Sequence, residues 1–385
     1  MSSKDNSESI KQIAKNLPGQ VVLVLQGGGA LGSYQAGVYQ ALHEAGIEPD
    51  WIIGTSIGAI NASLIAGNEP EDRLARLREF WKRMAQKPVW NFGEVFPGFN
   101  DKLSYWSTVT NGIAGFFRPN PLAHASDAFV LGPERAGYYT TAPLERTLEE
   151  LINFDLTNRC TPRLTVGAAN VRNSQMRYFD SRDSIIGVKH VMASGALPPA
   201  FPAVRIDGEL YWDGGILSNT PTEAVFDDNP RRDSLIFSVH LWNPTGSEPT
   251  TMAEVFNRHK DVQYSSRIAT QIMRQQETHR LRHIINQLAT RRPEAERGSA
   301  AVRELAKYGC QTRMHVVRLL APRLDRETHT KDIDFSPDGI RQRWEAGYAH
   351  TRSVLARAPW DAGEFDPLSG VILHEHMEFM QQAAE

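Results

Sequence analysis

The stretch that decides the fold is residues 21–67, which read VVLVLQGGGALGSYQAGVYQALHEAGIEPDWIIGTSIGAINASLIAG. Residues 21–25 are a continuous apolar run, the pattern of a strand that is buried on both faces. Three glycines follow, Gly27, Gly28 and Gly29, and they let the backbone turn tightly with its N–H groups open to a ligand. A helix is expected from about residue 32 to residue 46.

The second half of this stretch predicts a reactive serine. Residues 51–53 read as a strand and residues 59–66 as an apolar helix, and the G-T-S-I-G sequence between them spans residues 54–58. A G-x-S-x-G sequence between a strand and a helix is the context of a nucleophile elbow, in which the serine lies on a strained turn with an exposed hydroxyl. The predicted nucleophile is therefore Ser56.

A dinucleotide-binding fingerprint is the competing interpretation, because residues 27–32 also fit the pattern G-x-G-x-x-G after a strand. That fingerprint requires an acidic residue about 20 positions further on, after the second strand, to bind the ribose. Here the second strand leads directly to Ser56, while Glu48 and Asp50 precede the strand. The sequence therefore favours the nucleophile elbow.

Composition and charge limit the possible classes of protein. The chain has 385 residues, of which 41% are hydrophobic and 23% charged, enough for one large α/β domain and an accessory region. The net charge of −3 indicates no general attraction to nucleic acid. We find no apolar run of membrane-spanning length and no signal-type segment. A cytoplasmic protein is expected, with peripheral contact at the inner membrane face left open.

An attacking serine needs donors that stabilise the oxyanion formed on an ester carbonyl. The backbone N–H groups of Gly28 and Gly29 are predicted to be these donors. They follow the first strand and precede a helix, whose dipole also favours negative charge. Because neighbouring parallel strands end at the same edge of a sheet, the glycine turn and Ser56 should lie close together.

The base that activates Ser56 is predicted to be Asp213, which ends a short predicted strand. Gly214 and Gly215 follow it and permit a tight turn that holds the carboxylate against the serine. An aspartate has a reference pKa of about 3.9, so it is ionised at pH 7 and can accept a proton. None of the 12 histidines has a motif of its own, and the three nearest the predicted sheet are interpreted as structural: His43, His190 and His240.

These motifs, in this order and spacing, resemble the patatin-like phospholipase family over residues 20–242. The ALPPAFP segment before Asp213 is similar to that family as well. The resemblance implies a three-layer α/β/α fold and hydrolysis of acyl esters through an acyl-enzyme. It also implies a Ser–Asp dyad, with Ser56 as nucleophile and Asp213 as base, and no cofactor or metal. Gly28 and Gly29 correspond to the oxyanion hole, and the remaining motif glycines are Gly27, Gly32, Gly54, Gly58, Gly214 and Gly215.

One departure from the family concerns Leu31, since many members have Arg or Lys there, at a position associated with a phospholipid phosphate. Three functions therefore remain open. The first is a lipid acyl hydrolase that acts on phospholipid or other fatty-acyl esters. The second is a hydrolase of hydroxyacid esters such as an intracellular polyester. The third, disfavoured because all the catalytic motifs are present, is a binding module on a retired hydrolase fold.

The chain is expected to have three parts. Residues 1–19 form a polar tail, residues 20–243 the hydrolase domain, and residues 244–385 a mostly helical C-terminal extension resembling one found in some bacterial patatin-like proteins. The strand predicted at residues 235–241 is expected to be the last of the main sheet. An insertion at about residues 90–140 is rich in aromatic residues. It either packs on the core or forms a cap over an apolar acyl site.

Overall fold

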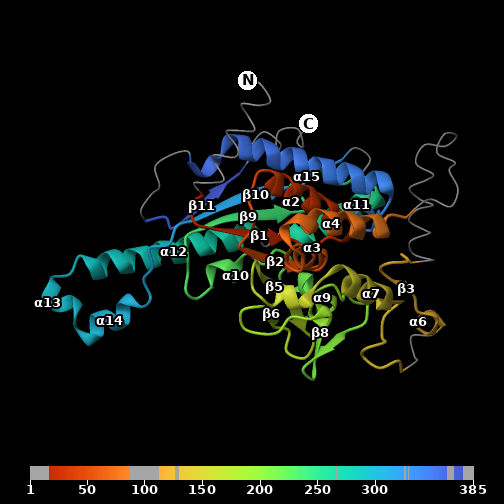
Figure 1. The fold of residues 1–385 in the computed structure, drawn as a ribbon, viewed down its shortest axis with the longest axis horizontal. Helices are drawn as coiled ribbons and strands as arrows, with labels where there is room; N and C mark the ends of the chain where they lie inside the picture. Colours follow the sequence, from red (N-terminus) through yellow and green to blue (C-terminus); the bar gives the residue numbers. More distant parts are fainter. Residues whose placement is uncertain are drawn as a thin grey trace.

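The computed structural model describes residues 17–86, 112–125, 130–265, 268–324, 327, 329–361 and 368–375. Much of the aromatic-rich insertion, residues 87–111 and 126–129, therefore lies outside the described residues. Within the described part, one nine-stranded sheet organises the molecule (Figure 1). Its strands lie in the order β11 (Val371–His374), β10 (Met314–Leu320), β9 (Ser234–His240), β1 (Gln20–Leu25), β2 (Trp51–Thr55), β5 (Arg163–Asn170), β8 (Glu209–Asp213) and β7 (Val204–Ile206), with β6 (Met176–Asp180) paired to β5.

The strands from β11 to β5 run parallel, and β6, β8 and β7 pair antiparallel. The central strand β1 is fully enclosed, as its continuous apolar run predicts. In the β1–β2 register Leu25 lies opposite Gly54, so both strands end at one level. The turns after β1 and β2 therefore meet at the same edge of the sheet.

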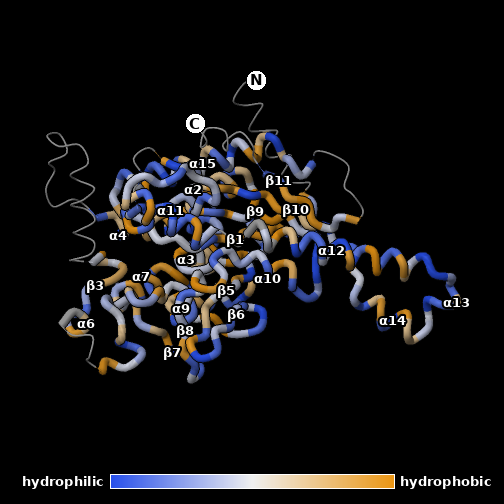
Figure 2. The backbone as a smooth tube through the Cα atoms, turned by 180° about the vertical axis from the view of Figure 1, so that it is seen from behind, coloured by the Kyte–Doolittle hydropathy of each residue, from blue (hydrophilic) through white to orange (hydrophobic). Residues whose placement is uncertain are grey.

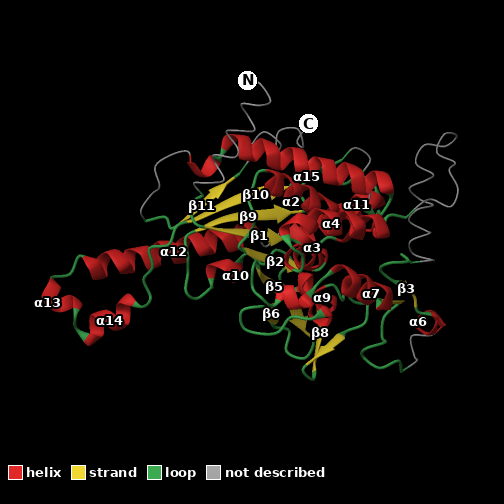
Figure 3. Ribbon diagram, viewed as in Figure 1, coloured by secondary structure: helices red, strands yellow, loops and turns green. Residues whose placement is uncertain are grey.

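Helices cover both faces of the sheet, which makes the predicted three-layer α/β/α architecture (Figure 3). One face packs against α2 (Ser33–Glu44), α3 (Ile57–Ala66), α4 (Pro70–Met84) and α15 (Pro337–Arg357). The other packs against α10 (Glu223–Phe226) and α12 (Ile268–Thr290). The remaining helices are α6 (Pro121–Ala125), α7 (Ala142–Leu151), α8 (Phe154–Thr157), α9 (Val188–Ser194), α11 (Met252–Ser265), α13 (Glu294–Arg297) and α14 (Ala300–Ala306).

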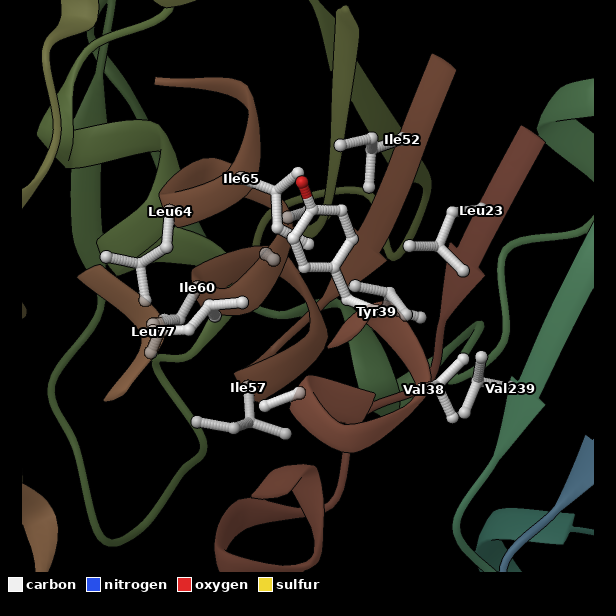
Figure 4. Close-up of a cluster of buried hydrophobic side chains, with 14 of the residues drawn as sticks. Leu23, Val38, Tyr39, Ile52, Ile57, Ile60, Leu64, Ile65, Leu77 and Val239 are labelled. Atoms are coloured by element: carbon white, nitrogen blue, oxygen red, sulfur yellow. The ribbon is translucent and has the colours of Figure 1, made fainter. Parts of the chain in front are cut away.

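The larger core cluster lies between the sheet and helices α2 and α3 (Figure 4). Leu23 of β1 and Ile52 of β2 point into it, and Tyr39 of α2 and Ile60 of α3 meet them from the helical layer. Each of these side chains is at most 1% exposed. This apolar layer holds α3 rigidly against the sheet, so the residue that precedes α3 has a fixed position.

The C-terminal region continues the same sheet. β10 pairs with β9 along its whole length, and β11 pairs with β10. The expectation that β9 is the last strand of the main sheet is therefore wrong. The buried apolar residues of β10 pack into this sheet beside β9.

Helix α15 crosses α2 at two glycines. A Cβ atom added to Gly37 would lie 1.9 Å from the carbonyl oxygen of Trp344, and one added to Gly347 would lie 2.1 Å from that of Tyr34. Without side chains at these positions the two helix backbones are in contact. The C-terminal region is thus packed tightly on the part of the chain that precedes the predicted catalytic serine.

Helices α13 and α14 and the outer part of α12 project from the body of the molecule (Figures 1 and 2). This arm, residues 280–308, lies away from the edge at which β1 and β2 end. Its exposed apolar side chains include Leu288, Leu305 and Tyr308, each more than 60% exposed. Because they are separated from that edge, they make no part of the site described next.

Candidate active site

Ser56 lies on a sharp turn between β2 and α3. Its backbone angles, φ 56° and ψ −125°, are in a region that a non-glycine residue adopts at a cost. The turn also requires glycine on both sides. A Cβ atom at Gly54 would lie 2.3 Å from the Gly58 carbonyl oxygen, and one at Gly58 would lie 2.2 Å from the Leu25 carbonyl oxygen. This is the strained strand-to-helix geometry that exposes a nucleophile.

A second serine, which the sequence analysis did not identify, holds this turn in place. The Ser56 N–H donates a hydrogen bond of 2.9 Å to the Ser194 hydroxyl oxygen. Ser194, at the end of α9, in turn donates to the carbonyl oxygen of Gly167 on β5 at 2.6 Å. Ser194 is fully buried, so the backbone of Ser56 is fixed to the neighbouring strand.

Asp213 reaches Ser56 because β5 lies between β2 and β8. β8 pairs antiparallel with β5, with Asp213 opposite Ala168, and the chain turns at once into Gly214. A Cβ atom at Gly214 would lie 2.5 Å from the Gly167 carbonyl oxygen, so this close turn requires glycine. The Asp213 carboxylate accepts a hydrogen bond of 2.7 Å from the Gly215 N–H and interacts with the Ser56 side chain beside it.

The surroundings of Asp213 change its acidity. Its side chain is almost completely buried, at 2% exposure. This burial raises the pKa of the carboxyl from 3.8 to about 7, and the hydrogen bonds from Ser56 and Gly215 oppose the rise. A carboxyl with a pKa near neutrality can both accept and return a proton at physiological pH.

The glycine turn after β1 lies directly against the elbow. A Cβ atom at Gly27 would be 3.1 Å from that of Ser56. The Gly27 carbonyl oxygen accepts hydrogen bonds from the Trp242 indole N–H at 2.8 Å and from the Asn219 amide at 3.2 Å. These two donors fix the orientation of the peptide bond from which the turn continues.

Gly28 and Gly29 follow with their N–H groups unengaged, since neither has an acceptor among the described residues. Gly29 has φ 55°, and a Cβ atom there would lie 2.2 Å from the Asp332 carbonyl oxygen, so the position requires glycine. The turn continues into a short 3-10 helix, η1 (Gly29–Gly32). Two free N–H groups at a helical start, beside a serine hydroxyl, can stabilise an oxyanion.

The three histidines considered from the sequence have other surroundings. His240 is fully buried and hydrogen-bonds Ser238 at 2.8 Å. Burial and the nearby Arg318 hold its pKa well below the usual value. His190 accepts a hydrogen bond from the Gly187 N–H at 2.9 Å, and burial lowers its pKa. His43 contacts Glu48. Each of them serves a local structural contact.

The supporting residues Ser194, Asn219 and Trp242 carried no motif in the sequence. Trp242 could have been found by one rule: it follows β9, which lies beside β1, and parallel neighbours end at the same edge. Within the described residues, no cluster of three or more His, Cys, Asp or Glu side chains could hold a metal ion. Nor does the described part include a helix that is long and apolar enough to cross a bilayer.

Comparison with known proteins places this site in a family. Residues 23–226 match the family described as "Patatin-like phospholipase", and residues 262–366 match one described as "Patatin phospholipase". The first match covers more than half of the chain and contains the elbow, the glycine turn and Asp213. The chain belongs to the patatin-like phospholipase family.

Individual relatives are longer proteins. The Lysophospholipase nte1 of Aspergillus terreus (strain NIH 2624 / FGSC A1156) is 46% identical over 270 aligned residues, which cover 63% of this chain and 15% of that protein. An uncharacterized NTE family protein of Mycobacterium tuberculosis (strain ATCC 25618 / H37Rv) is 27% identical over 225 residues, 58% of this chain and 31% of the relative. The chain therefore spans less than a third of the length of these curated relatives.

Among solved structures, VipD from Legionella pneumophila matches 96% of this chain and 74% of its own, with 16% sequence identity and a TM-score of 0.38. The type III effector protein ExoU matches 88% of this chain and 53% of its own, with 15% identity and a TM-score of 0.29.

Proposed function

We propose that the protein is a serine acyl hydrolase of lipid esters that uses Ser56 as nucleophile and Asp213 as base. The observation that carries the proposal is the position of the buried Asp213 carboxylate beside Ser56, which lies on a strained elbow. The N–H groups of Gly28 and Gly29 support it, because they have no acceptor among the described residues and directly follow Gly27, which lies against Ser56. A serine, a base and oxyanion donors are together sufficient for acyl transfer.

In the first half of the reaction, Asp213 accepts the Ser56 proton while the serine oxygen attacks the ester carbonyl. Gly28 and Gly29 donate hydrogen bonds to the oxyanion. The intermediate collapses, Asp213 returns the proton to the leaving alcohol, and the acyl group stays on Ser56. Water then attacks the acyl-enzyme, with Asp213 again accepting and returning a proton.

The ionised form of Asp213 is the active base, so its pKa of about 7 sets the pH dependence. We expect kcat/KM to rise as the pH increases through this value and to level off above it.

The substrate class remains a choice between fatty-acyl esters of lipids and esters of hydroxyacids. Leu31 keeps the second class in consideration. It is 4% exposed and packed in the core, so this position offers no cation to a phosphate group. Fatty-acyl esters stay the first choice, because they agree with the family to which the chain belongs.

Contact with a membrane or lipid surface is a further part of the proposal. Helix α11 has an exposed apolar stripe formed by Met252, Val255, Phe256 and Val262, all at helical spacing on one face. The inner face of the same helix packs beside the glycine turn, through Tyr264 on Trp242. Co-flotation of the protein with lipid vesicles measures this contact.

Active-site labelling tests the proposed nucleophile. A fluorophosphonate probe should label the wild-type protein and should not label Ser56→Ala, which should also lose esterase activity by about a thousandfold or more. Ser174→Ala is the matched control, because Ser174 is an exposed serine that also has φ 56°. Labelling of a folded Ser56→Ala protein would show that another residue is the nucleophile.

A panel of substrates distinguishes the two ester classes. It comprises p-nitrophenyl esters of increasing chain length, a phospholipid, a triacylglycerol and a short polyester. Faster turnover with long acyl chains supports lipid esters, whereas preference for hydroxyacid esters supports the alternative. A wild-type protein that is folded, unlabelled and inactive on every substrate would favour a binding module.

A further inference from the structure

Two segments of the C-terminal region border the candidate active site. The first is α11, and the second is the short 3-10 helix η3 (Lys331–Ile333). η3 packs against η1, and the Asp332 carbonyl oxygen lies so close to Gly29 that a Cβ atom there would be 2.2 Å away. The glycine turn carries the proposed oxyanion donors Gly28 and Gly29, and we call it the oxyanion turn from here on. It is therefore in direct contact with a residue more than 300 positions away in the sequence.

Two ion pairs connect these segments to each other. Lys331 of η3 pairs with Asp261 of α11 at 2.7 Å, and both side chains are at most 4% exposed. Lys260 of α11 pairs with Asp332 of η3, also at 2.7 Å. A buried pair of this kind is costly to break, because removal of one partner leaves an uncompensated charge. The pairs therefore fix α11 relative to the oxyanion turn.

This arrangement brings Tyr264 of α11 to the site. Its ring packs on the Trp242 indole with ring centroids 4.9 Å apart, and that indole donates to the Gly27 carbonyl oxygen. From the backbone side, the Gln26 amide donates to the Tyr264 carbonyl oxygen at 3.3 Å. The tyrosine is thus held from both ends next to the glycine turn, and it is only partly buried.

The surroundings of Tyr264 keep its phenol protonated. Burial raises the pKa of its phenol, and the carboxylates of Asp213 and Asp332 raise it further. The phenol is therefore protonated at neutral pH and can act as a hydrogen-bond donor.

We propose that Tyr264 donates a hydrogen bond to the alcohol oxygen of the ester and so contributes to recognition and departure of the leaving group. The inference rests on the proposed hydrolase function. Tyr264 packs on Trp242, whose indole N–H bonds the Gly27 carbonyl oxygen, and Gly27 lies against Ser56, so the phenol borders the turn at which the ester would be bound. Tyr264 keeps its proton throughout: the C–O bond breaks, the alcohol oxygen takes the proton from Asp213, and the phenol stabilises the negative charge that develops on it.

The dependence of rate on the leaving group tests this role in the full-length protein. The variant Tyr264→Phe keeps the ring that packs on Trp242 and removes only the hydroxyl group. The substrates are p-nitrophenyl butyrate and ethyl butyrate, which share an acyl group. An ethoxide leaving group develops more charge than p-nitrophenolate and needs the donor more. We expect kcat/KM of Tyr264→Phe to fall by about 10–100-fold with the ethyl ester, and by about threefold or less with the p-nitrophenyl ester.

A matched control is Tyr308→Phe, because Tyr308 is 65% exposed on the projecting arm and should leave both rates unchanged. Fluorophosphonate labelling of Ser56 in Tyr264→Phe should proceed as in wild type, since the oxyanion turn is intact. Equal losses with both esters, or no loss, would overturn the role of Tyr264 while leaving the hydrolase function in place. A wild-type protein without turnover of either ester would overturn both.

Discussion

At the scale of single residues, the Asp213 carboxyl is the proposed catalytic base, and its burial lowers the stability of the folded protein when it is ionised. Its carboxyl has a pKa of about 7 in the folded protein, because it is buried, and an ordinary value when the chain is unfolded. Between these two values the folded state binds a proton that the unfolded state does not. Folding stability contributed by this group therefore falls as the pH rises from about 4 to about 7.

Replacing this carboxyl by an amide, which does not ionise, should remove this loss of folding stability. We expect Asp213→Asn to unfold at a higher temperature than wild type at pH 8, by an amount corresponding to roughly 2–4 kcal/mol. At pH 4 the two proteins should differ little, because the wild-type carboxyl is then protonated in the folded state and about half protonated in the unfolded state. Calorimetry at the two pH values measures this difference. A variant that is less stable than wild type at pH 8 would mean that the hydrogen bonds of Asp213 outweigh its burial.

The same substitution should abolish turnover. An amide cannot accept the Ser56 proton, so Asp213→Asn should lose esterase activity nearly as completely as Ser56→Ala. His190→Ala and His240→Ala should retain most activity when folded, because the partners of both histidines are local. Steady-state kinetics with p-nitrophenyl butyrate compares the three variants. A histidine variant that is folded but inactive, beside an active Asp213→Asn, would replace the dyad by a triad.

At the scale of elements, the described part of the aromatic insertion packs on the core. Phe117 is 6% exposed, and its ring lies 4.8 Å from that of Tyr139 and 5.4 Å from that of Phe201. Phe116 is less buried and contacts Phe201 and Phe335. Phe201 belongs to the segment that leads to Asp213. Whether the insertion also covers the acyl site stays a prediction, since residues 87–111 and 126–129 are not described.

Substitutions of Phe116 and Phe117 distinguish packing on the core from contact with the acyl chain. Phe117→Ala should lower the free energy of unfolding by about 3–5 kcal/mol, because it empties a buried position, and should leave the chain-length profile unchanged. Phe116→Ala should reduce the rate with a decanoyl ester about tenfold relative to an acetyl ester, if its ring contacts the acyl chain. Melting temperatures and p-nitrophenyl ester rates measure both effects. An unchanged ratio in Phe116→Ala would leave the insertion with a purely structural role.

The crossing of α2 and α15 gives a second prediction at this scale. Gly347→Ala places a methyl group 2.1 Å from the Tyr34 carbonyl oxygen, so the helices must separate. We expect a loss of about 1–3 kcal/mol in the free energy of unfolding, measured by urea titration. Gly298→Ala is the control, because a Cβ atom there meets nothing within 4 Å. Equal stabilities of the two variants would show that the helices adjust without cost.

At the scale of the whole molecule, the C-terminal region belongs to the sheet. The proposed boundary at residue 243 divides the chain just after β9, whose other edge is covered by β10. A chain ending at residue 243 would expose that edge and the face of α2 that carries Gly37. We expect it to aggregate on expression, whereas the full chain stays in solution. Size-exclusion chromatography of both proteins compares them, and a monomeric, folded truncated chain would support an independent hydrolase domain.

Local pattern predicted most of the elements and the central motifs. The buried run of β1, the elbow at Ser56 and the turn after Asp213 all depend on short sequences, so each was found. Tertiary pairing was not predictable in this way. Nothing in the seven residues of β10 indicates that its partner is β9. Tyr264 was not identified from the sequence for the same reason, because only the packing of α11 brings it beside the glycine turn.

The strand order also governs the time at which the sheet can form during synthesis. Gln20 of β1 pairs with Ser234 of β9, a separation of 214 residues. At about 5–20 residues per second, a ribosome needs roughly 10–40 s to add that length of chain. Until then one edge of β1 has no partner, although β2 follows within seconds. The nascent chain therefore carries an unpaired, valine-rich edge until β9 emerges, which is more than half of the time that its synthesis takes.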